Sequence, residues 1–198
     1  MQLENQRRSN AERSEAMRRS LIGVARRLFT EKGYAATGTP ELVEAAGVTR
    51  GALYHHFADK RALFAAVVES ESGAVAAEIE AAAPASVEPV TALVEGSIAY
   101  LRAMSAPGRT RLLLLDGPAV LGRETMDEID ARHGNRTLRE GLAAAMRAGA
   151  IRRLPLGPLT SMLGAMLDRA ALDGDASDDH IRVVSAVVGG LATSSGSS

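Results

Sequence analysis

The chain has 198 residues, enough for one large domain or two small ones, and 46% of them are hydrophobic. Only 3% are aromatic, so we expect a core of Ala, Leu, Val and Met, a composition that favours helices. The absence of cysteine excludes disulfides, thiolate metal sites and a cysteine nucleophile. No apolar run approaches the roughly 18 residues of a transmembrane helix, and the polar N-terminus lacks a signal peptide, so we expect a cytoplasmic protein without a membrane partner.

The net charge of −1 conceals a difference between the first third of the chain and the rest. Residues 1–64 carry 11 Lys and Arg against 7 Asp and Glu, a balance of +4. Residues 65–198 carry the other 12 basic and 17 acidic residues, a balance of −5. This distribution fits a small polyanion-binding module on an acidic body, although solvated surface charge without a function gives the same pattern.

The first predicted helix comes after a short polar segment. Residues 1–10 lack periodicity and contain Arg7 and Arg8, so we expect a flexible basic arm there. From residue 11 to residue 32 apolar side chains recur at helical spacing, which predicts an amphipathic helix that ends at Gly33.

The segment from Thr37 to Lys60 contains two short helical patterns and the start of a third. We expect Thr39, Thr49 and Asp59 to cap these three helices in turn. Gly47 suits the left-handed conformation that ends the first of them. Two helices joined by such a turn form a helix-turn-helix, whose second helix can enter the major groove of DNA.

The outward face of the second short helix is the expected DNA-reading surface. Arg50 can donate two hydrogen bonds to a guanine, and His55 lies on the same face. Gly51 and Ala52 are small enough to let the helix backbone approach the groove, although a glycine inside a helix costs about 1 kcal/mol relative to alanine. Three more side chains lie where a phosphate would pass: Tyr54, His56 and Lys60. We expect no metal at the two adjacent histidines, because they point about 100° apart and have no third ligand nearby.

The rest of the chain is predicted to be a bundle of helices. The expected helices are residues 59–82, 90–104, 109–115, 124–148, 158–172 and 178–192. A proline-punctuated loop is expected at 83–89, a junction of low regularity at 116–122, and a disordered tail at 193–198.

The last two predicted helices show more apolar surface than one neighbour would need. Two such helices can meet the same pair of a second chain and form a homodimer interface, for which the candidate residues are Leu159, Leu163, Leu167, Ile181, Val184 and Val188. The alternative is that these residues form a core within one chain.

Two further sets of residues suggest a site in the body. A mostly apolar set with a few polar groups suits a small-molecule pocket, or alternatively plain core: Ser97, Tyr100, Met104, His133, Met162 and Met166. Asp127, Asp130 and His133 lie one helical turn apart, a spacing found in the metal sites of helical bundles. A metal-dependent enzyme with ligands around Asp130 and His133 is therefore the alternative function, although Glu95 is the only acid in the preceding inner segment.

Residues 25–64 resemble the DNA-binding domain of the tetracycline-repressor (TetR) family. The resemblance rests on LF…GY from Leu28 to Tyr34, AGV from Ala46 to Val48, and LYHHF…K from Leu53 to Lys60. The segments LLLLDGPAVLG (112–122) and DARHG (130–134) are also similar to one branch of actinobacterial members. Pro40 is a departure, because some relatives have a polar or basic residue there that can reach DNA.

The resemblance implies an all-α, dimeric transcriptional regulator without enzyme activity or cofactor. Its partners would be a palindromic operator in double-stranded DNA and a small-molecule effector that releases a repressor. The implied domains are a helix-turn-helix domain at 11–58 and an effector-binding and dimerisation domain at 59–192. By resemblance, the base-reading positions are Thr49, Arg50, Gly51, Ala52 and His55, and the phosphate-contacting positions are Thr39, Tyr54, His56 and Lys60.

Overall fold

The computed structural model describes residues 2–83, 88–174 and 177–193, with side chains from residue 10 onward. Its helices are α1 (Gln2–Lys32), α2 (Thr39–Ala46), α3 (Arg50–His56), α4 (Lys60–Ala82), α5 (Pro89–Met104), the π-helix η1 (Arg111–Asp116), α6 (Gly117–Leu121), α7 (Arg123–Arg132), α8 (Gly134–Arg147), α9 (Leu156–Leu172) and α10 (Asp178–Gly189). Within the described residues there is no strand, only an isolated β-bridge between Ile151 and Ala192. The predicted all-α fold is confirmed.

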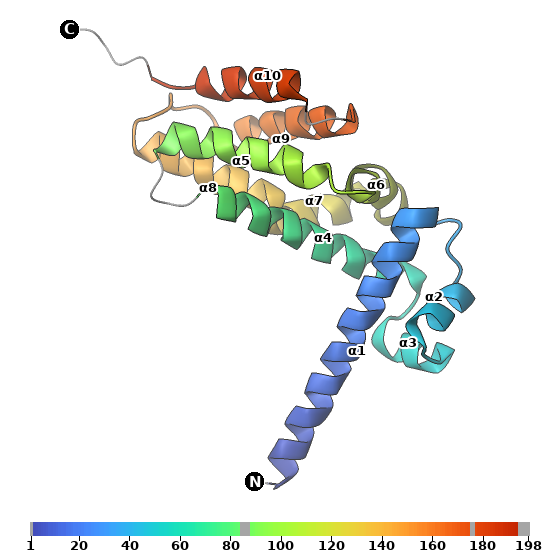
Figure 1. Ribbon diagram of the computed structural model, residues 1–198. Coiled ribbons are helices and arrows are strands. Elements are labelled where there is room, and N and C mark those ends of the chain that lie inside the picture. Colours follow the sequence, from blue (N-terminus) through green and yellow to red (C-terminus); the bar gives the residue numbers. More distant parts are fainter. Residues whose placement is uncertain (1, 84–87, 175–176, 194–198) are drawn as a thin grey trace, which may run out of the picture.

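Helices α2 and α3 lie beside α1 at one end of the molecule, as Figure 1 shows. Their apolar faces meet those of α1 and α4 in one core, whose largest fully buried side chains include Leu21, Phe29, Leu42, Leu53 and Phe64. The Phe29 and Phe64 rings pack edge to face at 5.2 Å, and Tyr34 closes the cluster. Large rings let this small module bury enough apolar area to hold three short elements together.

The same core continues past α4 into the body. Leu112 of η1, Leu121 of α6 and Ile129 of α7 belong to it, so no break in packing separates the helix-turn-helix from the helices of the body. A second core joins α5, α8, α9 and α10 at the other end of the molecule (Figure 1). Helix α4 runs between the two ends and therefore connects them mechanically.

Several element boundaries differ from the sequence expectation. Helix α1 is continuous from Gln2, so the expected arm at 1–10 is not a separate segment, apart from residue 1, which lies outside the described residues. Residues 84–87 of the expected loop at 83–89 lie outside the described residues. The same holds for residues 194–198 of the expected tail at 193–198. The expected irregular junction at 116–122 is instead the end of η1 followed by α6.

The predicted helix over 124–148 is wrong in one respect, because it is two helices. His133 has φ −125° and ψ −102°, which ends α7 and starts α8. The His133 ring lies against Gly73 of α4, and its Nε2 lies 2.6 Å from Oε1 of Glu69. This tertiary contact, together with the conformational freedom of Gly134, favours a break where the apolar periodicity alone indicated continuity.

Most of the side chains proposed for the dimer interface lie in the core of the chain itself. Leu163, Leu167, Val184 and Val188 are buried, and for these four the assignment is corrected. Leu159 and Ile181 are partly buried against that core, and their place in an interface stays a prediction. The large apolar side chains that α9 and α10 leave exposed are Met162, at 73%, together with Leu172, Val183 and Val187.

The described helices include none that is both long and apolar enough to cross a membrane.

Candidate nucleic-acid interface and ligand cavity

The turn between α2 and α3 has the geometry of a helix-turn-helix. Gly47 has φ 64° and ends α2, while Val48 packs onto the core. Thr49 caps α3, because its Oγ1 accepts a hydrogen bond from the backbone N–H of Ala52 at 3.2 Å. The expected cap of α2 is wrong: Gly38 holds that position, and Thr39 is the first helical residue.

Helix α3 buries one face and presents the other to solvent. Leu53 is buried beneath it, as is Phe57 just beyond its C-terminus. The expected DNA-contacting residues that are exposed are Thr49, Arg50, Gly51, Tyr54 and His55, and those that are partly buried are Thr39, Ala52, His56 and Lys60. The exposed face of α3 is thus formed largely by the side chains that the sequence assigns to DNA.

Arg50 and Tyr54 hold each other in place on this face. The guanidinium carbon of Arg50 lies 5.5 Å from the centre of the Tyr54 ring, within range of a cation–π contact. Hydrogen bonding to Arg50, and then to Thr39, lowers the pKa of the Tyr54 hydroxyl. The Tyr54 ring therefore limits the rotation of the Arg50 side chain.

Lys60 does not point toward a ligand in this structure. Its Nζ donates to the backbone carbonyls of Tyr34 and Thr37, each at 3.0 Å, and lies 4.1 Å from the centre of the Tyr34 ring. Thr37 is fully buried, and its hydroxyl donates to the carbonyl of Gly33 at 2.8 Å. Lys60 therefore ties α4 to the turn before α2, and a phosphate contact from it stays a prediction.

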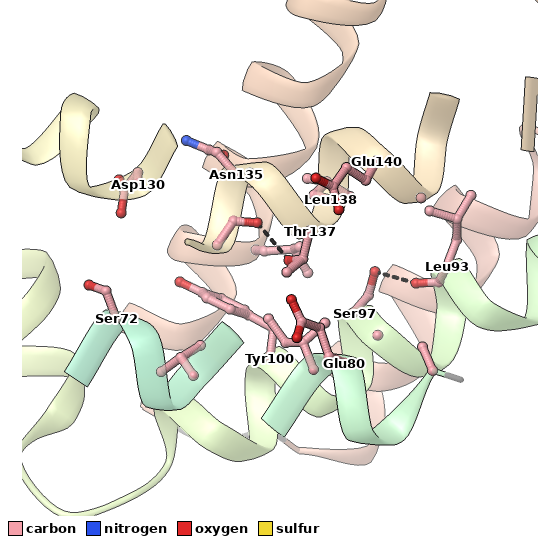
Figure 2. Close-up of a pocket in the computed structure, with 18 of the residues that line it drawn as sticks. Ser72, Glu80, Leu93, Ser97, Tyr100, Asp130, Asn135, Thr137, Leu138 and Glu140 are labelled. Atoms are coloured by element: carbon pink, nitrogen blue, oxygen red, sulfur yellow. Dashed lines mark hydrogen bonds between the residues drawn. The ribbon is translucent and has the colours of Figure 1, made fainter. Parts of the chain in front are cut away.

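A cavity of about 460 Å³ lies in the body and is drawn in Figure 2. Helices α4, α5, η1, α7, α8 and α9 supply its wall, which is mostly apolar and includes Val75, Ile79, Leu113, Leu114 and Leu138. A cavity of this size falls in the range that holds small organic ligands.

The six residues proposed for an effector pocket divide into two groups. Ser97, Tyr100 and Met104 of α5 line the cavity. His133 is not among the lining residues, because it turns to Glu69, and Met162 is exposed on the opposite face of α9. Met166 packs against the second core and does not line the cavity either.

Two carboxylates of the cavity wall are not among the residues that the sequence assigns to a pocket. Asp130 comes from α7, and Asp168 from α9. The Tyr100 hydroxyl donates to Oδ1 of Asp168 at 2.5 Å. Burial, followed by the charge of Asp168, raises the pKa of Asp130 to about 6, and burial also raises the pKa of Asp168 despite the bond from Tyr100.

A buried ion-pair network connects α1 to the body. Glu71 of α4 accepts hydrogen bonds from Arg26 of α1 at 2.7 and 3.0 Å, and from Arg109 at 3.1 Å. Burial by itself raises the pKa of Glu71, but the bonds from the two guanidinium groups outweigh it and the pKa is lowered. This carboxylate is fully compensated.

Close contacts reinforce the same junction. Arg61, at the start of α4, donates to the carbonyls of Val120 and Leu121 in α6. Gly108, with φ 74°, lies so close to Thr30 of α1 that a β-carbon there would overlap the Thr30 side chain. The helix-turn-helix is therefore fastened to both α6 and the turn before η1.

The alternative metal centre has no matching ligand set. Within the described residues, no group of three or more His, Asp or Glu side chains lies close enough together to hold a metal ion. His133 pairs with Glu69, which also binds Arg132, while Asp130 lines the cavity.

A helix-turn-helix with an exposed second helix, joined to a helical body with a cavity, defines the class of one-component DNA-binding regulators. Comparison with known proteins identifies the family. Residues 21–67 match the model for bacterial regulatory proteins of the tetR family, and residues 90–192, more than half of the chain, match the tetracyclin repressor-like C-terminal domain. The chain belongs to the TetR family of transcriptional regulators.

Individual relatives agree with this assignment. The chain is 38% identical over 108 residues to the HTH-type transcriptional regulator AcrR of Shigella flexneri, which covers 54% of this chain and 50% of that one. It is 44% identical over 62 residues to the HTH-type transcriptional repressor Rv1474c of Mycobacterium tuberculosis, covering 31% and 33%. The match thus spans half or less of the length of these relatives.

A solved structure extends the comparison to nearly the whole fold. A TetR-family transcriptional regulator from Pectobacterium atrosepticum superposes with a TM-score of 0.73 at 29% identity, covering 92% of this chain and 97% of that one.

Proposed function

We propose that this regulator is a cytoplasmic, dimeric repressor that binds a palindromic operator and is released by a small molecule in the cavity. The observation that carries the proposal is the sharing of α4 between the two sites. Helix α4 begins at Lys60, directly after the helix-turn-helix, and its Ser72, Val75 and Ile79 line the cavity. A ligand that moves α4 would therefore also move α3.

Release follows from geometry in a dimer. Two recognition helices must be separated by roughly 34–36 Å, or a multiple of it, to enter successive major grooves on one face of DNA. A ligand that binds better to a conformation with another separation lowers operator affinity by the difference in its binding free energies.

The exposed apolar face of α9 and α10 supports the dimer. Met162, Val183 and Val187 project from these helices, away from the core. An isologous contact between two such faces would bury them in a four-helix arrangement.

Replacing Val183 with Asp should yield monomers in light scattering. Val184 is a core residue, so the same replacement there should instead unfold the chain.

Footprinting on the DNA upstream of its own gene tests the proposal. At moderate salt the protein should protect a palindromic segment and bind random DNA much more weakly. Equal affinity for both would contradict the proposal.

Replacing Arg50 with Ala should weaken binding to the operator by about 1–3 kcal/mol and binding to random DNA only slightly, if Arg50 reads a guanine.

Gly51 offers a test in which stability and DNA binding change in opposite directions. A β-carbon at Gly51 would meet only Thr49 Oγ1, at 3.9 Å, so the fold does not require glycine there. Gly51→Ala should stabilise the chain by up to about 1 kcal/mol. If the backbone of α3 contacts the groove, the same change should weaken operator binding.

A further inference from the structure

The charged groups in the cavity wall all have one sign. Four carboxylates contribute to it, those of Glu80, Asp130, Glu140 and Asp168, and the described lining residues include no Lys, Arg or His. A carboxylate that leaves water needs a cation or hydrogen-bond donors in exchange. The wall therefore sets the charge of the ligand it can accept.

The two outer carboxylates share one cationic partner. Glu80 and Glu140 are exposed, and both bind Arg136, at 2.7 and 3.2 Å. Arg136 itself does not line the cavity. Water and one guanidinium therefore offset the charge of these two groups.

The two inner carboxylates have no such partner. Within the described residues, neither Asp130 nor Asp168 forms a salt bridge, and the bond from Tyr100 is neutral. Their carboxylate oxygens that lack a hydrogen bond remain accessible, and both residues line the cavity. In Figure 2, Asp130, the hydroxyl of Ser72 and the hydroxyl of Tyr100 approach the same space from three helices.

The charged form of these two carboxylates is costly in the cavity wall. Each carboxylate raises the energy of the other, in addition to the cost of burial. A neutral ligand would displace their water and increase that cost, and an anion would be repelled. A metal ion would lack a third protein ligand among the described residues.

We propose that the effector of this regulator is an amphiphilic organic amine, whose protonated nitrogen binds Asp130 and Asp168 while its apolar body packs against α4 and η1. This inference rests on the proposed function, because it names the chemistry of that same effector. The amine N–H groups donate to the carboxylates, and the side chains of Val75, Ile79 and Leu113 contact the hydrocarbon.

Calorimetric titration of the full chain with two matched sets of ligands tests the ligand class. The sets are octylamine, octanol and octanoate, and phenethylamine, phenethyl alcohol and phenylacetate. The amine of at least one set should bind about tenfold or more tighter than its alcohol, and the carboxylates should bind most weakly. Alcohols or carboxylates that bind as tightly as the amines, or two amines that do not bind, would overturn the inference.

Variants locate the binding. Asp130→Asn and Asp168→Asn should each weaken amine binding by about 10- to 100-fold and leave alcohol binding nearly unchanged. Glu128→Gln is the matched control, because Glu128 lies on the same helix, is exposed and does not line the cavity. An equal loss in the control, or no loss in either cavity variant, would contradict the assignment, and thermal unfolding of each variant confirms that it is folded.

Operator release is measured separately, by titrating the protein–DNA complex with the same amines. Binding of an amine without release would leave the ligand class standing and contradict the proposed function. Release by the alcohols or carboxylates alone would support the proposed function and contradict the ligand class.

Discussion

Glu71 on one side, and Asp130 with Asp168 on the other, are carboxylates shielded from water in different surroundings. Glu71 lies at the junction of α1, α4 and the turn before η1, held by two guanidinium groups. Asp130 and Asp168 lie in the cavity wall, where Asp168 accepts a hydrogen bond from the Tyr100 hydroxyl and neither forms a salt bridge with a described residue. Burial acts against the charged form in both places, yet the pKa of Glu71 is lowered and those of Asp130 and Asp168 are raised. A compensated charge fastens two parts of a fold, and an uncompensated one is available to a ligand.

The largest effect is expected at the compensated site. Glu71→Gln leaves the Arg109 guanidinium, which is only 9% exposed, without its buried carboxylate partner. Arg109 keeps its bonds to Glu78 and to the Ala103 carbonyl, so the cost should lie at the lower end for a broken buried pair, about 3 kcal/mol of unfolding free energy in urea denaturation. Glu78→Gln is the control, because Glu78 contacts the same Arg109 from a side chain that is 49% exposed, and the loss there should stay below about 1 kcal/mol. Similar losses in both variants would mean that burial of Glu71 does not matter.

A gain in stability is expected on substitution of Asp130, which has no compensating cation. The pKa of Asp130 rises from 3.8 to about 6 on folding, so its stabilising contribution is present below pH about 4 and is lost as the pH rises through about 6. Asp130→Asn removes this loss and should stabilise the empty protein near neutral pH by about 1–3 kcal/mol. The gain should shrink toward zero in urea titrations near pH 4. A destabilised variant at neutral pH would show that the charge of Asp130 is compensated after all.

The affinity for an amine should depend on pH in the way that the protonation of Asp130 does. An amine requires the ionised carboxylate, so its affinity should fall as the pH drops through about 6, by up to about tenfold per unit, in calorimetry. The titratable groups that face Asp130 are Asp168 on α9, Tyr100 on α5, and Asp127 and His133 on either side of it in sequence. Burial raises the pKa of Asp168 as well, so its protonation also weakens amine binding as the pH falls. An affinity that does not change over this range would separate the ligand from the carboxylates.

The smallest effect is expected for Arg26, the more exposed of the two arginines that bind Glu71. Arg26 is 37% exposed, and Glu71 keeps its bond to Arg109 when Arg26 is replaced. Arg26→Gln should therefore cost about 1 kcal/mol or less in urea denaturation. Arg27→Gln, at an exposed neighbouring position, is its control and should be neutral. A cost as large as that of Glu71→Gln would mean that Arg26, and not Arg109, provides the main compensation.

Local signals predict the helix-turn-helix well, and tertiary contacts explain what they miss. Thr49, Asp59 and Gly47 act within one turn of their own position, so their capping roles follow from the sequence and are confirmed. The sequence assigns Lys60 to DNA because its position along the chain is compatible with a phosphate contact. Its real partners are carbonyls 23 and 26 residues earlier, which no local pattern reveals.

The body shows the same limit. Helix α10 has apolar residues in adjacent pairs, Val183 with Val184 and Val187 with Val188, so two faces are equally apolar in sequence. Only packing decides that Val184 and Val188 go inward, which is why the interface residues expected from the sequence lie one position away from the exposed ones. Asp168 in the second half of α9 has the pattern of a solvated acid until α5 places Tyr100 against it.

The tight fit of Gly108 against Thr30 has a mechanical consequence. Because the Thr30 side chain fills the space where a β-carbon of residue 108 would lie, the end of α1 and the turn before η1 have little room to slide. Helix α1 extends far beyond this contact (Figure 1). In the proposed release, the contact would be a pivot: a small tilt near the cavity would become a larger displacement at α3, in proportion to the distance from Gly108.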